Sequence, residues 1–242
     1  MLASASLAML ALIPSVVGYG HIINHVWTID APSDGLSDLT FPITLNQVHH
    51  ERGYYFAQQF NFYNNISVGY IGVQPRKDSN CGKPVLHAAF SSFQKGATSK
   101  HPNCTDGADG GSGVSCAIEF AGGSYDHTWN YTVDNTEGTT WRGRMIDTVT
   151  GDSHEIGVWT LPETAGKIRP DQLGFFEYYP WNGEPADCPN LPLAEVTFGW
   201  PTSSQGSGGL IKEPYEVGDC KGKTNATWNK VEEGWVQKAG FI

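Results

Sequence analysis

Short runs in which apolar and polar residues alternate recur along the whole chain. In such a run every second side chain faces the same way, which indicates a half-buried β-strand. The runs are separated by turn-forming residues, drawn from 29 Gly and 14 Pro, and no amphipathic pattern of helical period extends over ten residues. The pattern predicts ten strands: Ile22–Ile29, Leu39–Leu45, Tyr54–Tyr63, Val68–Gln74, Val85–Phe93, Trp129–Val133, Thr139–Asp147, Glu155–Leu161, Phe175–Tyr179 and Glu195–Trp200.

Many short strands at this spacing predict an all-β fold, an antiparallel β-sandwich of the jelly-roll or lectin-like type. We expect one domain over residues 19–242, with a disulfide-closed C-terminal extension from about residue 187 to 242 that packs back through its tryptophans. Two segments rich in Gly, Ser and Asp, 101–116 and 201–214, are predicted to be loops.

The stretch Gly53–Arg76 reads as a hairpin with two different faces. With a four-residue turn over Asn64–Ser67, Tyr63 would lie opposite Val68. Alternation then places one set of side chains in the core and the other on a polar, aromatic face. The core set is Phe56, Phe60, Phe62, Ile71 and Val73, and the polar set is Tyr55, Gln59, Asn61, Tyr70, Gln74 and Arg76.

The next predicted strand alternates in the same way. Leu86, Ala88 and Phe90 suit the core, which places His87 on the other side. If this strand neighbours the hairpin, His87 joins the polar set.

Tyrosines, amides, a guanidinium and an imidazole on one face suit a sugar. Aromatic rings stack on the apolar faces of pyranoses, and amides and guanidinium groups bond their hydroxyls. We therefore expect carbohydrate binding, with contacts from Tyr55, Gln59, Asn61, Tyr70, Gln74, Arg76, His87 and Glu177. The alternative is a solvated outer sheet face, although Lys, Glu and Thr, the usual residues of such a face, are scarce there.

The same face could instead catalyse β-elimination on a uronic-acid polymer. Gln74 and Arg76 would neutralise the carboxylate of the substrate, and His87 or Tyr70 would take the C5 proton. Such an arrangement is similar in kind to the sites of jelly-roll polysaccharide lyases, whose strand motifs are not found in this chain.

Glycoside hydrolysis requires two carboxyl groups. Glu177, inside the aromatic segment GFFEYYPWN, is the best single candidate, because burial among aromatic rings raises the pKa of a carboxyl group. No second carboxylate stands out from the sequence, and a purely structural role for Glu177 is the competing interpretation.

Two metal sites are considered, although no cofactor is expected. Asp106 and Asp109 lie in a loop tight enough to wrap calcium, but their spacing does not match the twelve-residue EF-hand loop. Cleavage just before His21 would expose a terminal His, as in copper-dependent polysaccharide monooxygenases, with His50 or His87 as the second ligand. No further part of that family's pattern follows.

Residues 1–18 are uncharged and contain an apolar run too short to span a bilayer, which predicts a signal peptide and a secreted, extracellular protein. The excess of 25 acidic over 15 basic residues argues against nucleic acid and anionic membrane as partners, and we expect a monomer. Four Asn-x-Ser/Thr sequons predict glycosylation at Asn65, Asn103, Asn130 and Asn225.

Five cysteines leave one unpaired. Because each of two pairs brackets a Gly/Ser-rich loop, we expect the disulfides Cys104–Cys116 and Cys188–Cys220, with Cys81 free.

Several short motifs occur in a recognisable order: GYIGVQPR, VLHAAFSSF, CTDGADGGSGVSC, WNYTV, IGVWTLP and GFFEYYPWN. This order, from Gly53 to Asn182, resembles a secreted fungal and bacterial family known only as a domain of unknown function. The resemblance implies a secreted β-rich domain and no particular activity.

Three functions therefore stay open. The leading expectation is a protein that recognises an extracellular or cell-wall polysaccharide. The second is a polysaccharide lyase that uses the same sheet face. The third is a secreted interaction protein with a protein partner.

Overall fold

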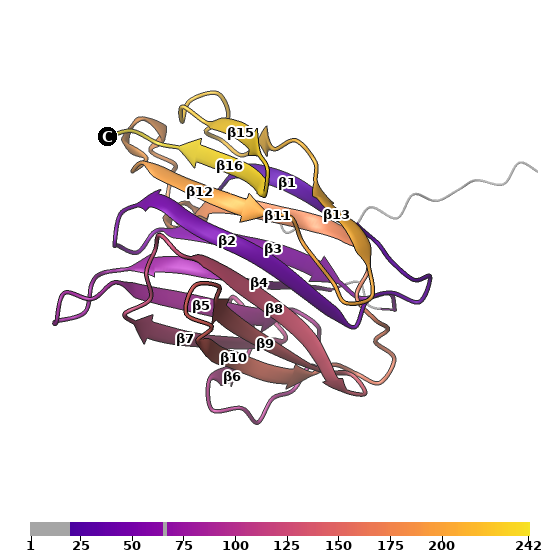
Figure 1. Cartoon of the computed structure of the whole chain (residues 1–242). Helices are drawn as coiled ribbons and strands as arrows, with labels where there is room; N and C mark the ends of the chain where they lie inside the picture. Colours follow the sequence, from indigo (N-terminus) through magenta and orange to yellow (C-terminus); the bar gives the residue numbers. More distant parts are fainter. Residues whose placement is uncertain (1–19, 65–66) are drawn as a thin grey trace, which may run out of the picture.

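The computed structural model describes residues 20–64 and 67–242, which form two antiparallel sheets packed face to face. In Figure 1, β12, β2, β8 and β9 of the smaller sheet lie over β11, β3, β4 and β5 of the larger one. The packed pair of sheets confirms the predicted β-sandwich, and the jelly-roll or lectin-like subtype stays a prediction.

The larger sheet has nine strands. Their spatial order is β13, β1, β11, β3, β4, β5, β7, β6, and β14 pairs with β1 outside this series. The strands are β1 (His21–Asp30), β3 (Tyr54–Asn61), β4 (Val68–Arg76), β5 (Val85–Ser92), β6 (Cys104–Asp106), β7 (Val114–Ala121), β11 (Asp171–Tyr178), β13 (Ser207–Ile211) and β14 (Tyr215–Glu216).

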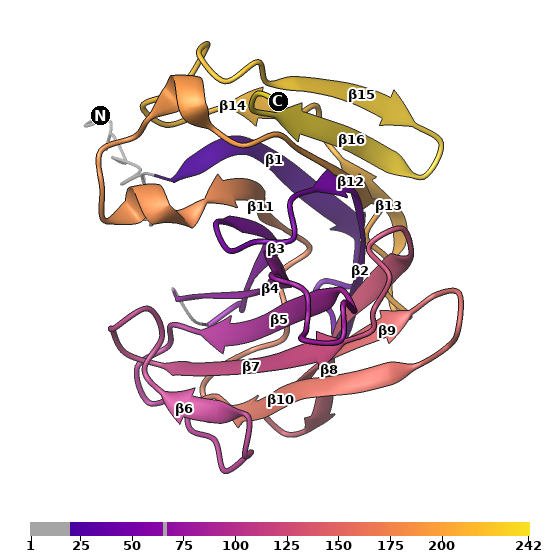
Figure 2. The same cartoon turned by 90° about the vertical axis from the view of Figure 1, so that its left-hand side faces the viewer.

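The smaller sheet has seven strands in the order β10, β9, β8, β2, β12, β16, β15. They are β2 (Asp38–Val48), β8 (Thr128–Glu137), β9 (Thr140–Asp147), β10 (Ser153–Thr160), β12 (Ala194–Gly199), β15 (Thr227–Val231) and β16 (Gly234–Ala239). Two short 3₁₀ turns, η1 (Tyr179–Asn182) and η2 (Cys188–Asn190), follow β11. The segment from residue 187 thus contributes three of the seven strands. Figure 2 shows these yellow and orange strands stacked on the side of β1.

The core between the sheets is aromatic. Phe60, Phe62 and Phe90 of the larger sheet meet Trp141 and Trp159 of the smaller one, and all five side chains are fully buried. The ring centroids of Phe90 and Trp159 lie 4.6 Å apart, and those of Phe62 and Trp141 lie 4.9 Å apart. The core face predicted for the hairpin is therefore confirmed.

The predicted hairpin register was wrong by two residues. Asn61, not Tyr63, lies opposite Val68, because β3 ends at Asn61. The next residues pair elsewhere: Phe62 forms a bridge with Ile168, and the Tyr63 amide donates to the Lys167 carbonyl. A shift by two residues leaves every side chain on the same face of the sheet, so the predicted assignment of the two faces is still correct.

Both segments predicted to be loops contain strands. β6 and the start of β7 lie within 101–116, and β13 lies within 201–214. These strands are short and lie at or near sheet edges, where Gly and Ser are tolerated because few side chains have to be packed. β14, β15 and β16 were not predicted either.

One polar cluster lies in the interior between the two sheets. His25 of β1 is fully buried, its Nε2 donates to Oε1 of Gln58 at 3.1 Å, and its Nδ1 accepts from Nε2 of Gln237 at 3.0 Å. Gly174 makes room for it, because a Cβ there would lie 2.1 Å from the His25 ring. Burial lowers the pKa of His25 to about 4, so the ring is neutral in the folded protein at neutral pH.

In the described part of the chain, no helix is long and apolar enough to cross a membrane.

Candidate functional site

The outer face of the larger sheet, opposite the core, carries three rows of side chains. The first row, here called the acid row, runs across the strands. Glu177 pairs with Tyr55, Gln74 with His87, and His87 with Glu119. Since Phe56 pairs with Val73, Tyr55 lies beside Gln74 and the row is continuous.

The second row, here called the floor, is made of small residues. Ala57 pairs with Gly72, Gly72 with Ala89, and Ala89 with Ala117, and Phe175 ends the row next to Ala57. Gly72 is required, because an added Cβ would lie 2.6 Å from the Cβ of Ala57 and 2.2 Å from the Phe56 carbonyl oxygen.

The third row contains Gln59, Tyr70, Ser91 and Ser115. The small floor residues Ala57 and Ala89 are covered, because the rings of Tyr55, Tyr70 and Phe175 pack with them in a second buried cluster.

Beside these rings lies a cavity of about 490 Å³, here called the outer pocket, whose lining includes Phe175 of the floor but none of its small residues. Its volume lies within the roughly 300–1,000 Å³ that small-molecule sites occupy. The lining residues are His21, Tyr55, Gln59, Val68, Tyr70, Gln74, Arg76, Phe93, Asp109, Phe175, Glu177, Tyr179 and Asn182.

Six of the eight predicted contact residues line the outer pocket: Tyr55, Gln59, Tyr70, Gln74, Arg76 and Glu177. Two do not. Asn61 is buried at the end of β3, and His87 lies further along the acid row, half-buried. The pairing of Gln74 with His87 confirms that β5 neighbours the hairpin.

Each guanidinium nitrogen of Arg76 donates a hydrogen bond to a protein group. Its Nε donates to Oε1 of Glu119 at 3.1 Å, its Nη2 to Oε1 of Gln74 at 2.6 Å, and its Nη1 to the Pro75 carbonyl. His87 also contacts Glu119, at 3.3 Å, and burial together with the charge of Arg76 lowers the pKa of His87 to about 4. The guanidinium charge therefore has a partner already, which disfavours its use on a substrate carboxylate.

In the part of the chain that the structure describes, Glu177 has no ion-pair partner, unlike Arg76, which pairs with Glu119. Its side chain is 6 % exposed, and Oε1 accepts one hydrogen bond, from Nδ2 of Asn182 at 2.7 Å. Burial raises the pKa of Glu177 from 4.5 to about 7, and the negative charge of Asp109 adds to this rise. The carboxyl group is thus protonated in mildly acidic solution and can give up its proton near neutrality. This confirms the sequence argument that its aromatic surroundings would raise the pKa.

Two tyrosine hydroxyls belong to the same pocket. The hydroxyl of Tyr70 donates to Asp109, at 3.2 Å from Oδ1. Tyr55 is 4 % exposed, and among the described residues its hydroxyl has no hydrogen-bond partner. A buried hydroxyl without a partner is costly to the folded state.

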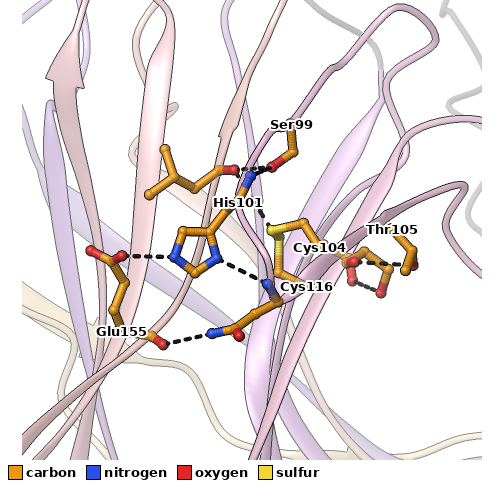
Figure 3. The surroundings of a disulfide bond; sticks show 10 residues. Ser99, His101, Cys104, Thr105, Cys116 and Glu155 are labelled. Carbon is orange, nitrogen blue, oxygen red and sulfur yellow. Dashed lines mark hydrogen bonds and ion pairs between the residues drawn. A yellow bond between two sulfur atoms is a disulfide. The ribbon is translucent and has the colours of Figure 1, made fainter.

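Asp109 reaches the outer pocket from the loop between β6 and β7. The Cys104–Cys116 disulfide joins the two strands and packs on Gly157 of β10, where a Cβ would lie 2.6 Å from either sulfur. Figure 3 shows the disulfide beside His101, whose Nε2 contacts Oε1 of Glu155 at 2.9 Å. The base of the loop is therefore held firmly. Asp109 itself is exposed and has a positive φ of 48°.

Sequence reasoning missed Asp109 as a pocket residue. It considered Asp109 only as a calcium ligand with Asp106, which lies exposed in β6. The signal that could have found it is the predicted disulfide, since stapling the loop fixes where its tip reaches. In residues 20–64 and 67–242, no group of three His, Cys, Asp or Glu side chains is arranged to hold a metal ion, so the calcium site stays an untested prediction.

His21 lies at the β1 side of the pocket. Its ring stacks on Phe175 with centroids 4.4 Å apart, and its Nδ1 lies 3.1 Å from Oδ1 of Asn24. Burial lowers the pKa of His21 to about 4. The two histidines considered as copper partners are engaged elsewhere, His50 with Asp78 and His87 with Glu119.

Both predicted disulfides, Cys104–Cys116 and Cys188–Cys220, are confirmed, and Cys81 is free and exposed. Two disulfides fit an oxidising compartment. The predicted signal peptide and Asn65 lie outside the described residues, and glycosylation of Asn103, Asn130 and Asn225 stays a prediction.

Comparisons with known proteins yield fold likeness alone. No family model and no curated protein matches the chain. Scytalido-glutamic peptidase, solved with a transition state analog inhibitor, shares 10 % identity at a TM-score of 0.48, over 92 % of this chain and 98 % of that chain.

Two further solved structures are similar. SCP-B, a peptidase of the Eqolisin family in a complex with the tripeptide Ala-Ile-His, shares 10 % identity at a TM-score of 0.44, again over 92 % and 98 % of the two chains. The CBM2 module of the evolved Dit of Lactobacillus casei BL23 phage J-1 shares 14 % identity at a TM-score of 0.29, over 64 % of this chain and 68 % of that chain. We assign no residue role from these similarities.

Proposed function

We propose that the protein binds a carbohydrate polymer in the outer pocket. The observation that carries this proposal is the outer pocket itself, a cavity of about 490 Å³ lined by hydroxyl, amide and aromatic side chains. A sugar unit in such a cavity can stack on an aromatic ring while amides and hydroxyls bond its hydroxyl groups.

The pocket groups suit hydroxyl ligands. Gln59 offers an amide, Gln74 offers the nitrogen of an amide whose oxygen is bonded to Arg76, and the partly exposed Phe93 and Tyr179 offer ring surface. Sugar hydroxyls both donate and accept, which matches this mixture of groups.

The charges of the pocket favour a neutral sugar chain. Asp109 repels an acidic glycan, Glu177 supplies no positive charge, and the one guanidinium in the lining is paired with Glu119. The lyase alternative needs a cation that is available to a uronate, so we place it second.

Retention on immobilised glycans tests the proposal. Wild-type protein, Gln74→Ala and Gln47→Ala are compared on neutral and acidic polysaccharides. Gln47 is an exposed glutamine of β2, on the other sheet, and serves as the matched control. Loss of one or two hydrogen bonds weakens binding about tenfold, so Gln74→Ala should lose retention while Gln47→Ala keeps it.

Equal retention of all three proteins would refute the site. Retention by no glycan at all, together with capture of a protein partner that added sugar does not release, would support the interaction protein instead. Products that absorb near 235 nm, released from an acidic glycan, would support the lyase.

A further inference from the structure

The outer pocket contains two carboxyl groups in opposite environments. Glu177 lies on the rigid strand β11, buried and without a cation. Asp109 lies at the tip of a loop, exposed to solvent. Acid–base catalysis on a glycosidic bond requires this division, with one carboxyl group that keeps its proton and one that stays ionised.

The structure holds Asp109 in place by several independent contacts. The loop is closed by hydrogen bonds from the Gly107 amide to the Gly113 carbonyl and from the Gly111 amide to the Ala108 carbonyl, and Ala108 is buried. The positive φ of Asp109 is a backbone conformation that few non-glycine residues adopt, and such conformations concentrate at functional sites. The Tyr70 hydroxyl donates a hydrogen bond to the Asp109 carboxylate and so restrains its position.

Tyr55 adjoins both the acid and the pocket. It pairs with Glu177 across β3 and β11, its side chain lines the pocket, and its fully buried hydroxyl has no hydrogen-bond partner among the described residues. Glu177 accepts its hydrogen bond from Asn182 and not from Tyr55, so Tyr55 does not hold the carboxyl group.

We propose that Glu177 and Asp109 hydrolyse a glycosidic bond of the polymer held in the outer pocket. The inference rests on the proposed function. Glu177 donates its proton to the glycosidic oxygen as the bond from that oxygen to C1 breaks. A water oxygen forms the new bond to C1, and the proton that it releases passes to Asp109. Asp109 returns a proton to solvent, and Glu177 takes one up before the next cycle.

The titratable groups around Glu177 leave its proton available. His21 from β1 is neutral near pH 7, and burial raises the pKa values of Tyr55 from β3 and Tyr70 from β4, so both stay neutral. Arg76, also in the pocket, faces Glu119. Asp109 is thus the charged group that acts on Glu177.

The experiment measures new reducing ends from neutral oligosaccharides of defined linkage, including glucans, xylan, mannan and chitin fragments. Wild type is compared with Glu177→Gln, Asp109→Asn and Glu163→Gln. Glu163 is an exposed glutamate outside the pocket and is the matched control. Circular dichroism and retention on glycan establish that each variant is folded.

We expect Glu177→Gln to lower the rate at least a hundredfold and Asp109→Asn at least tenfold, with Glu163→Gln within twofold of wild type. The wild-type rate should fall as pH rises through about 7, because Glu177 then loses its proton. Any residual activity of Asp109→Asn should fall at a lower pH, because the charge that helps to raise the pKa of Glu177 is gone.

Four results would overturn the inference. If Glu177→Gln is as active as wild type, Glu177 is not the general acid. Cleavage of peptides but not of glycans, dependent on Glu177, assigns the pair to another substrate class. Retention of glycans without any cleavage leaves the proposed function standing and refutes catalysis, whereas absence of both retention and cleavage refutes the two together.

Discussion

Two side chains, His25 between the sheets and Glu177 in the outer pocket, are both ionisable and buried, but they differ in how they are bonded. Each is an ionisable side chain with little exposure, and neither has an ion-pair partner among the described residues. Burial shifts the pKa of each toward its neutral form, lowering that of His25 and raising that of Glu177.

The difference lies in how completely each group is bonded. Both ring nitrogens of His25 have glutamine partners, and Gly174 leaves room only for the ring. Among the described residues, Nε2 of Gln58 and Oε1 of Gln237 have no further partner, but the His25 ring itself is completely bonded in a closed interior, which indicates a structural group. Glu177 has one hydrogen bond and lines an open pocket, which indicates a functional group.

The largest expected effect on stability is that of His25→Leu. The change leaves Gln58 and Gln237 without their shared partner, and each unpaired buried amide costs about 1–3 kcal/mol. The free energy of unfolding, measured by urea denaturation at pH 7, should fall by about 4 kcal/mol.

A suitable control for this change is His49→Leu at an exposed position, with an expected effect within about 0.5 kcal/mol. A small loss in His25→Leu would show that the interior cluster is not a structural element, and the contrast with Glu177 would fail.

A smaller effect, of opposite sign, is expected for Glu177→Gln. Because the folded state raises the pKa of Glu177 from 4.5 to about 7, its contribution to stability is full below pH 4.5 and is lost as pH rises to 7. Glutamine does not ionise, so the variant should match wild type near pH 4.5 and be about 3 kcal/mol more stable at pH 8.

Urea denaturation of the matched pair at several pH values measures this difference. His21 and His25 have lowered pKa values, so their contribution to stability is lost as pH falls from 6.5 toward 4. Both proteins contain these histidines, so their contribution cancels when the unfolding free energy of wild type is subtracted from that of the variant. A difference that does not change with pH would mean that Glu177 titrates normally.

The smallest expected effect is that of Asn182→Ala. The hydrogen bond from Asn182 lowers the pKa of Glu177 and partly opposes the effect of burial. Its removal should move the titration midpoint of the Glu177 carboxyl upward by less than about one pH unit. Carbon-detected NMR of the side-chain carboxyl carbon, assigned with Glu177→Gln, measures this midpoint, and a downward movement would contradict the assigned hydrogen bond.

Alternation was a sufficient guide to most strands and to the faces of the hairpin. The core had to contain the apolar side chains Phe56, Phe60 and Val73. Alternation then placed Tyr55 and Gln74 on the opposite, outer face. The register itself was missed, because the pairing of Phe62 with Ile168 involves residues more than a hundred positions apart. Local pattern contains no information about such a partner.

The site was predicted in part for the same reason. Glu177 could be singled out from its aromatic neighbours, but its partner Asp109 depends on a disulfide and a loop conformation. The floor could not be predicted either, because its residues Ala57, Gly72 and Ala89 become neighbours only when three strands have paired.

The pairing of β1 with β11 places His21 opposite Glu177, at the edge of a pocket whose other lining residues, apart from Tyr179 and Asn182, come from the chain between them. No short fragment can therefore contain the pocket, and its strands come together only with the pairing of distant segments, a slow step in β-rich folding. A bound sugar chain would hold together the two ends of this span and raise the unfolding temperature with its concentration. Thermal shift is thus a readout of occupancy that needs no knowledge of the reaction.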